Sequence, residues 1–222
     1  MSRLDARLRA VAHLLAFVAG AVDALGYLML GGFFVSFMSG NSTRLGVAIG
    51  TGQWTQATMA GALITLFVIG VGCGSVAGER AGRWRVPLLL ALEAALLLAA
   101  AALPLAGWPR PGISVMVLAM GVSNTVFARN GVVAFGVTYM TGALVRVGEG
   151  LGAAALGRKG NGWHFSAMSW LSLVAGGAVG ASLHDGYGVN AFWLLGAVVA
   201  ALAVLLAGWP EAAALGEGRE QG

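Results

Sequence analysis

Two carboxylates stand inside apolar stretches of this sequence, where charge is costly. Asp23 and Glu93 each lie within a run of mostly aliphatic residues. Because lipid cannot solvate a charge, such side chains usually face a cavity or a polar partner and serve ions, protons or substrates. We expect Asp23 to bind a cation or carry a coupling proton, with a structural carboxylate bonded to a neighbouring helix end as the alternative. Glu93 is expected to hold a proton or to pair with a cytoplasmic arginine.

Polar residues also gather at two matching places. The stretch VSFMSGNSTRLG covers Val35 to Gly46, and VTYMTGALVRVG covers Val137 to Gly148. A helix that breaks at glycine exposes backbone groups that a solute, an ion or water can satisfy but lipid cannot. We interpret Gly40 and Gly142 as helix interruptions beside a polar cavity; interfacial loops with permissive glycines are the alternative. The residues predicted to line a substrate or ion pathway are Asp23, Tyr27, Ser39, Gly40, Asn41, Arg44, Asn124, Thr141, Gly142 and Arg146.

The two polar stretches belong to a longer internal repeat. Gly20, Asp23 and Tyr27 share one helical face by their spacing, and Asn124 is the repeat mate of Asp23. We expect Asp23 and Asn124 to face one another and to line the pathway. Ridges of small residues let helices approach closely in lipid, and the matched ridges are Gly70 with Gly74 and Gly176 with Gly180.

Two arginines occupy equivalent positions in the repeat, Arg44 and Arg146. They are expected to hold an anionic group on a substrate or to act as gates, for example with Glu149, three residues after Arg146 on the same helical face. Interfacial side chains that extend toward the lipid headgroups are the alternative. The predicted coupling or gating residues are Asp23, Glu93 and Glu149.

The elements that position these side chains are predicted to be membrane-spanning helices. The sequence is 58% hydrophobic and 10% charged, with a mean hydropathy of +0.82. These values lie outside the range of soluble globular proteins. Apolar runs close to the roughly 20 residues that cross a bilayer as helix lie near Ala10–Leu30, Ala57–Ala77, Val86–Ala106, Ile113–Arg129, Phe165–Leu183 and Val189–Leu206.

Arginine placement favours six spans over eight. The segments 33–51 and 132–156 could be re-entrant, interfacial or full spans, but eight spans would export the cluster ERAGRWR, against the tendency of Lys and Arg to remain in the cytoplasm. Six spans with both termini cytoplasmic leave only Arg44 and Arg110 outside. The predicted division is a cytoplasmic N-terminus at 1–9, a first three-helix repeat at 10–106, an external loop at 107–112, a second three-helix repeat at 113–208 and a cytoplasmic tail at 209–222.

Three spans per repeat is an odd number, so the second copy must enter the membrane from the opposite side. We therefore predict an all-α polytopic membrane protein with six transmembrane helices as a 3+3 inverted repeat, with interrupted segments around Gly40 and Gly142. Inverted repeats with broken helices recur in secondary transporters, where two pseudo-symmetric conformations open one site to alternate sides.

The stretches GAVDALGYLMLGGFFVSFMSGN, GVSNTVFARNG and VTYMTGALVRVGEGLG resemble the YoaK-type family of bacterial inner-membrane proteins of unknown function. The likeness covers roughly Leu14 to Leu206. The family usually has Gln-Asn where this chain has Ser123-Asn124, and Thr-Gly-Asn where it has Ser39-Gly40-Asn41. The resemblance implies a bacterial inner-membrane location and brings no established substrate.

A weaker resemblance concerns the stretch GERAGRWR, which is similar to the loop between helices two and three of major facilitator transporters. One half of such a transporter is likewise a three-plus-three inverted bundle. The resemblance implies a half-transporter that forms a two-fold dimer of twelve helices. The matching residues are Glu79, Arg80, Gly82, Arg83 and Arg85.

These patterns together predict a secondary transporter of a small polar or charged solute, proton-coupled through Asp23 and working as a homodimer in the bilayer. A passive channel or facilitator and a non-transporting membrane scaffold are the alternatives. The sequence contains no catalytic triad, zinc-protease motif or phosphate-binding loop, so we do not expect an enzyme. It also has no metal-ligand spacing and no basic patch interleaved with aromatic residues, so we expect no metal, cofactor or nucleic acid.

Overall fold

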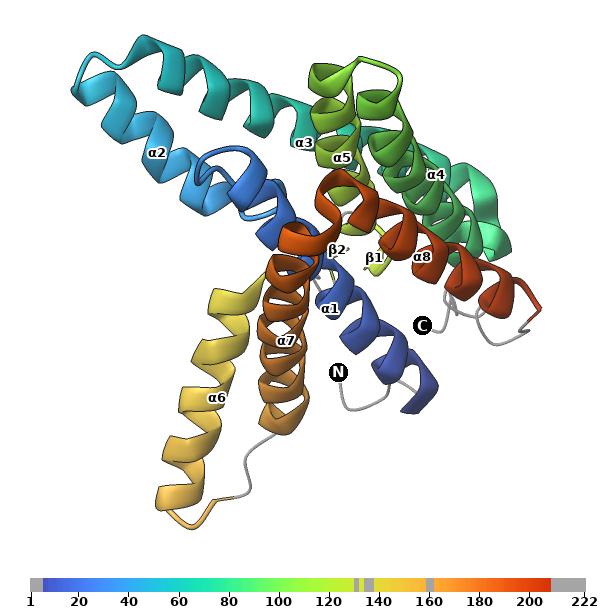
Figure 1. Cartoon of the computed structure of the whole chain (residues 1–222). Helices are drawn as coiled ribbons and strands as arrows, with labels where there is room; N and C mark the ends of the chain where they lie inside the picture. The colour runs from blue at the N-terminus through green and yellow to red at the C-terminus, as the bar shows by residue number, and fades with distance from the viewer. Residues whose placement is uncertain (1–5, 130–131, 134–137, 159–161, 209–222) are drawn as a thin grey trace.

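The chain folds into a bundle of helices of unequal length (Figure 1). The computed structural model describes residues 6–129, 132–133, 138–158 and 162–208, so the predicted tail at 209–222 and residues 1–5 of the predicted N-terminal segment lie outside the described residues. The helices are α1 (Ala6–Met29), α2 (Met38–Gly50), α3 (Trp54–Ala81), α4 (Arg85–Leu105), α5 (Pro109–Ser123), α6 (Met140–Ala155), α7 (Trp163–Tyr187) and α8 (Ala191–Ala207). Two-residue strands, β1 (Ala128–Arg129) and β2 (Val132–Val133), pair antiparallel between α5 and α6.

Three continuous helical stretches are long and apolar enough to cross a membrane: Arg9–Met29, Trp54–Leu105 and Trp163–Ala207. At 1.5 Å per residue, the 52 residues of the second stretch would extend about 78 Å if straight. The hydrocarbon core of a bilayer is only about 30 Å thick. The second and third stretches must therefore change direction, and each does so at a 3₁₀ turn, η1 (Gly82–Trp84) and η2 (Gly188–Asn190).

The two turns use the same backbone device. Gly82 ends α3 with φ +52° and ψ −122°, and Gly188 ends α7 with φ +52° and ψ −128°. A positive φ of this kind is accessible to glycine and strained for residues with a Cβ. Glycine thus fixes the corner from α3 into α4 and the corner from α7 into α8, a match between Gly82 and Gly188 that the sequence comparison missed.

Two helix pairs cross with backbone against backbone. α1 packs on α7, and a Cβ added to Gly20 would collide with the carbonyl oxygen of Leu173, as one on Gly176 would with that of Phe17. α3 packs on α5 in a similar manner. The predicted close approach through small residues is therefore confirmed at both crossings, where added Cβ atoms on Gly70 and Gly121 would lie 2.5 Å from the carbonyl oxygens of Leu118 and Phe67 respectively.

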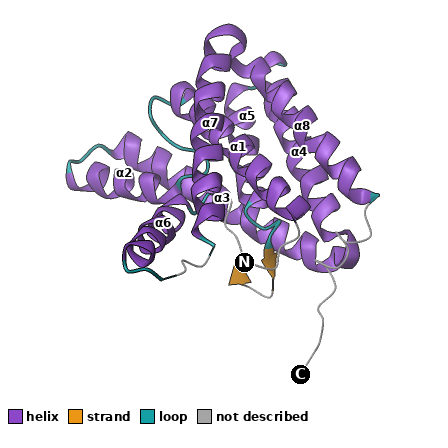
Figure 2. Cartoon of the chain, turned by 90° about the horizontal axis from the view of Figure 1, so that it is seen from below, coloured by secondary structure: helices purple, strands orange, loops and turns teal. Residues whose placement is uncertain are grey.

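Two short helices lie on the outside of these crossings. α2 packs on α3 and α6 packs on α7, and both views place α2 and α6 on the side of the molecule away from α4 and α8 (Figures 1 and 2). α2 has 13 residues and α6 has 16, which gives lengths of about 20 and 24 Å. Both are shorter than a bilayer core, so the segments 33–51 and 132–156 are not full helical spans.

The interruption lies before the predicted glycines rather than at them. Gly40 and Gly142 are the third residues of α2 and α6, within the first turn of each helix. The irregular backbone precedes them, at residues 30–37, which we call the first link, and at the described residues 124–127 and 138–139 with the β1–β2 pair between them, which we call the second link. Local sequence shows that a break is present, but the first residue of the following helix depends on where the link finds hydrogen-bond partners.

The fourth predicted span ends too late. α5 stops at Ser123, before the predicted end at Arg129, which lies in β1. The amide nitrogen of Asn124 donates to the carbonyl of Met120 over 2.9 Å, and the hydroxyl of Thr125 donates to that of Val122 over 2.7 Å. The backbone N–H groups of Thr125 and Val126 donate to the carbonyls three residues back instead of four, so the helix ends in a turn that these side chains reinforce, although the sequence remains apolar.

The core is distributed unevenly around the bundle. α4 packs along both α5 and α8, whereas α8 meets α1 at only a few positions. The fully buried side chains at the centre of the α4 and α8 packing include Leu89, Leu90, Leu97, Phe192 and Val199. The α4 side of the bundle is therefore more closely packed than the junction of α8 with α1.

The α1–α7 crossing predicts a large difference between two glycine substitutions. Gly20→Ala should lower stability by about 1–3 kcal/mol, because the new methyl group meets backbone that cannot rotate away. Gly61→Ala, in α3, meets no atom within 4 Å and should be neutral or slightly stabilising. Thermal unfolding of the purified protein in detergent measures both, and equal midpoints for the two variants would contradict the close crossing.

Candidate functional site

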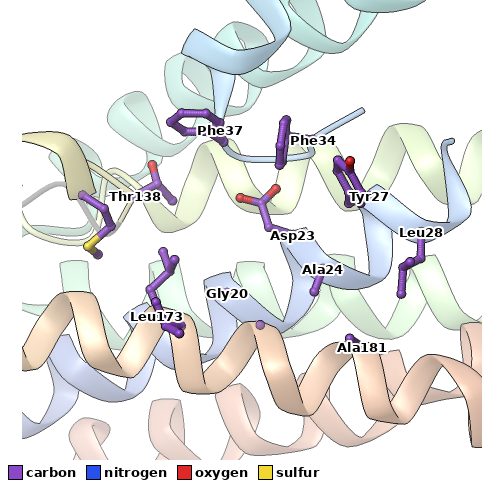
Figure 3. Close-up of a pocket in the computed structure, with 13 residues that line it drawn as sticks. Gly20, Asp23, Ala24, Tyr27, Leu28, Phe34, Phe37, Thr138, Leu173 and Ala181 are labelled. Carbon is purple, nitrogen blue, oxygen red and sulfur yellow. The ribbon is translucent and has the colours of Figure 1, made fainter. Parts of the chain in front are cut away.

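A pocket of about 550 Å³ lies between α1, the first link and α7, and we call it the Asp23 pocket (Figure 3). Thr138 of the second link and Met140 of α6 complete it, so both links contribute to its wall. The predicted face of α1 is confirmed, since Gly20, Asp23 and Tyr27 all line this pocket. The full lining is Gly20, Asp23, Ala24, Tyr27, Leu28, Phe34, Phe37, Thr138, Met140, Leu173, Val174, Gly177 and Ala181.

Asp23 holds the first link in place. One carboxylate oxygen accepts the backbone N–H groups of Val35 and Ser36, each over 2.8 Å, and the other accepts the hydroxyl of Ser36. Backbone donors outside a helix need partners within a membrane, and this carboxylate supplies them just before α2 begins. The alternative interpretation of Asp23 as a carboxylate bonded to a neighbouring helix end is therefore confirmed, and it leaves the carboxylate in the pocket wall.

Asn124 makes the corresponding contact with the second link. Its side-chain oxygen accepts the hydroxyl of Thr138 over 3.1 Å, and both residues are buried. Thr138, not Asn124, reaches the pocket lining. Asn124 thus does not line this pocket beside Asp23. Asp23 of α1 binds the hydroxyl of Ser36 and Asn124 binds that of Thr138, and of these four residues Asp23 and Thr138 reach the pocket.

Aromatic rings cover the pocket beside Asp23. The rings of Tyr27 and Phe34 lie 5.1 Å apart, and those of Phe34 and Phe37 lie 5.2 Å apart with an edge-to-face geometry. Asn41 fixes this group, because its side chain accepts the N–H of Phe34 over 3.0 Å and donates to its carbonyl over 2.6 Å. The fully buried Asn41 therefore positions an aromatic residue of the pocket without lining it.

The remaining predicted pathway residues lie outside the pocket lining. Arg44 is half-buried with its guanidinium 4.7 Å from the centre of the Phe33 ring, so it packs on its own link. Within the described chain, no ion pair joins Arg146 to Glu149, although both are exposed on α6. A pathway or gating role for these three residues stays a prediction. The same holds for the remaining predicted pathway residues, which are Ser39, Gly40, Thr141 and Gly142.

A family profile described as "Protein of unknown function (DUF1275)" matches residues 11–205 of the chain. The chain belongs to this family. The UPF0700 transmembrane protein RA0705 of Rhizobium meliloti (strain 1021) is 36% identical over 180 residues, which cover 81% of this chain and 77% of that protein. The UPF0700 transmembrane protein YoaK of Bacillus subtilis (strain 168) is 33% identical over 155 residues, 66% of this chain and 68% of that protein. No solved structure matches the chain.

The family relationship confirms the YoaK-type resemblance and establishes the chain as a membrane protein. Within this DUF1275 protein the sequence analysis missed Ser36 and Thr138, the link residues that bind Asp23 and Asn124. A signal was present, because each is the second residue of its repeated stretch, VSFMSG or VTYMTG. No comparable pattern indicated Leu173 or the other α7 residues. On an apolar helix, the residues that line a pocket have the same types and spacing as those that face lipid.

A second buried polar group of this DUF1275 protein lies where α4 meets the end of α5. Glu93 is 1% exposed, and neither carboxylate oxygen has a hydrogen-bond partner in the described chain. The buried hydroxyl of Ser123 is a polar neighbour of Glu93 without reaching hydrogen-bond geometry. No arginine donates to Glu93, so the expected hydrogen-bonded pairing with a cytoplasmic arginine is wrong, and a proton site there stays a prediction.

The predicted loop motif divides between surface and core. Glu79, Arg80, Gly82 and Arg83 are exposed at the end of α3 and in η1. Arg85 begins α4 and is buried, and it donates a hydrogen bond of 3.0 Å to the carbonyl of Thr125. In this protein the last arginine of the motif therefore ties the α3–α4 corner to the residues that follow α5.

The environment of Glu93 predicts that the carboxyl group opposes stability. Glu93→Met, which keeps the length and removes the unsatisfied oxygens, should raise the free energy of unfolding by about 1–3 kcal/mol. Glu79→Met, at an exposed position, is the control and should change it little. Thermal unfolding in detergent compares the two, and a clear loss of stability in Glu93→Met would show that the carboxyl has a structural partner.

Proposed function

We propose that this membrane protein is a secondary transporter of a small charged solute, coupled to protons through Asp23 and working as a homodimer. The carrying observation is the Asp23 pocket, into which the residues around both links bring side chains and a carboxylate. Pockets of about 300–1,000 Å³ with a few convergent polar groups are typical of small-molecule sites. The proposal includes no enzymatic activity.

The proposed architecture is an inverted repeat, with α1 to α4 equivalent to α5 to α8. Three structural similarities between the two halves support it. Asp23 binds Ser36 as Asn124 binds Thr138, the α1–α7 crossing corresponds to the α5–α3 crossing, and matching turns follow α3 and α7. The proposal counts three spans in each repeat, with the turn residues 124–127 extending the 15-residue α5. Because three is an odd number, the copies would cross the bilayer in opposite directions, as in many secondary transporters.

The proposed location is the bacterial inner membrane with both termini in the cytoplasm. Lys and Arg concentrate on the cytoplasmic side of bacterial membrane proteins. With this orientation the exposed residues Arg80 and Arg83 at the α3–α4 corner lie inside, together with Arg158 after α6. Both UPF0700 relatives named above are bacterial transmembrane proteins.

The proposed coupling follows from the hydrogen bonds of Asp23. A proton on this carboxylate would convert one oxygen from an acceptor into a donor. The hydroxyl and the backbone N–H of Ser36 would then have one acceptor oxygen fewer to bind. A cation at Asp23 would compete for the same oxygens. Either event changes what holds the first link, and the link precedes α2 directly, so occupancy of the site is coupled to the position of that helix.

The proposed homodimer would cover apolar surface on the short helices. Val47 and Ile49 of α2 are exposed, as are Leu144, Val145 and Leu151 of α6. Both helices lie on the same side of the molecule (Figure 2). A second copy placed there would add helices around a pathway that a single chain of this size encloses with few.

Counterflow into proteoliposomes tests the proposed carrier. A carrier should exchange labelled substrate faster when unlabelled substrate is inside the vesicle, whereas a passive channel should show no such stimulation and a scaffold should move nothing. Asp23→Asn should abolish proton-coupled uptake, because an amide cannot take up the proton. The matched control is Asp185→Asn, on an exposed part of α7, and undiminished coupled uptake by Asp23→Asn would rule out coupling at this residue.

The two repeat glycines give a matched test of the pocket. A Cβ at Gly40 would lie 2.6 Å from the ring of Phe37, which lines the pocket, whereas a Cβ at Gly142 meets no atom within 4 Å. Gly40→Leu should therefore slow exchange by about tenfold or more, given an overpacking cost of about 1–3 kcal/mol. Gly142→Leu should leave exchange close to normal, and an equal loss in both variants would show that the glycines act through something other than the ring of Phe37.

A further inference from the structure

We infer that the Asp23 pocket binds an amphipathic organic cation, with its charged centre at Asp23 and its apolar body against the aromatic and aliphatic lining. As an account of the transported substrate, this inference rests on the proposed function. As an account of what the pocket binds, it stands on the contacts of the pocket alone. It narrows the sequence-based expectation of a small polar or charged solute.

The lining argues against a small, strongly hydrated solute. Its polar side chains are the carboxylate of Asp23, the hydroxyl of Thr138 and the phenol of Tyr27. The hydroxyl of Thr138 is already donated to Asn124. A sugar or an amino acid would leave most of its own hydrogen-bonding groups without partners, which is unfavourable for each group. The ligand that fits has a large apolar surface and few polar groups.

The charge of the site calls for a cation. Asp23 accepts hydrogen bonds from neutral donors of the first link, among them Val35 and Ser36, and no Lys, Arg or His forms an ion pair with it in the described chain. Charged groups in apolar surroundings are normally compensated by an opposite charge. The uncompensated charge lies in the wall of a pocket that a cation can enter.

The aromatic residues add to this preference. Figure 3 shows the carboxylate of Asp23 on the side of the pocket where the rings of Tyr27, Phe34 and Phe37 stand. The negative face of an aromatic ring attracts a cation, and aromatic residues around quaternary ammonium groups are a recurring arrangement. An organic cation therefore gains from both the carboxylate and the rings, whereas an inorganic ion would gain little from the apolar remainder of the wall.

The pair tetraphenylphosphonium and tetraphenylborate tests the inference directly. The two ions share size and shape and differ in the sign of their charge. Isothermal titration of the purified full-length protein in detergent should show saturable binding of the phosphonium ion and none of the borate. Equal binding of the two ions would overturn the inference, because it would identify an apolar site that lipid tails could fill.

Two substitutions locate the binding. Asp23→Asn should weaken phosphonium binding by about tenfold or more, since the ion then loses the negative charge that attracts it in an apolar site. Because that variant also alters the first link, Ala181→Trp provides a second test, filling the pocket from α7 without touching the hydrogen bonds of Asp23. It should abolish binding, while Ala175→Trp, which is exposed on a face of α7 turned away from the pocket lining, should retain it. Unchanged binding in Ala181→Trp would place the site elsewhere and overturn the inference.

The outcomes separate the site from the transporter. Binding of phosphonium without its counterflow in proteoliposomes would keep the cation site and reject the proposed carrier for this class of substrate. Counterflow of another solute by a protein that binds no phosphonium would keep the carrier and reject the organic cation.

Discussion

The structure depends on one constraint: peptide groups that leave a helix within a membrane must find partners inside the protein. The first link meets this constraint through Asp23 and Asn41, whose side chains accept the N–H groups of Val35, Ser36 and Phe34. In the second link, Asn124 receives the hydroxyl of Thr138. The polar residues that stood out in an apolar sequence are therefore required by the irregular backbone beside them. Because the partner of the first link is a carboxylate, the same contact also places a charge in the pocket.

The close crossings determine where that charge lies. Gly20 allows α1 to rest directly on the backbone of α7 at Leu173, and Asp23 is one helical turn further along. The pocket begins where this contact ends, so Gly20 and Leu173 form part of its lining. The helix–helix contact that stabilises the bundle thus also sets the distance between the carboxylate and the apolar wall opposite.

Most of the helices, the glycine ridges and the face of α1 that carries Asp23 could be predicted from the sequence. Each is marked by residues that repeat every three or four positions, or by the apolar composition that a lipid environment requires. Features that depend on distant partners were misplaced. α5 ends where Asn124 accepts the hydroxyl of Thr138 and the carbonyl of Thr125 accepts a hydrogen bond from Arg85, although the following residues are still apolar. The pocket wall from α7 could not be recognised, since Leu173 and Val174 differ from lipid-facing residues only in what stands across from them.

The unequal packing of α4 and α8 has a mechanical consequence for the proposed carrier. α4 is pressed along α5, while its counterpart α8 scarcely touches α1. If the two repeats are equivalent, α4–α5 and α8–α1 are the same junction in the two copies, and the structure shows it closely packed in one copy and loosely packed in the other. The change between the two conformations of the carrier would then require that α8 pack closely on α1 while α4 moves away from α5. The glycine crossings α1–α7 and α3–α5 would keep their contacts and act as pivots for this motion.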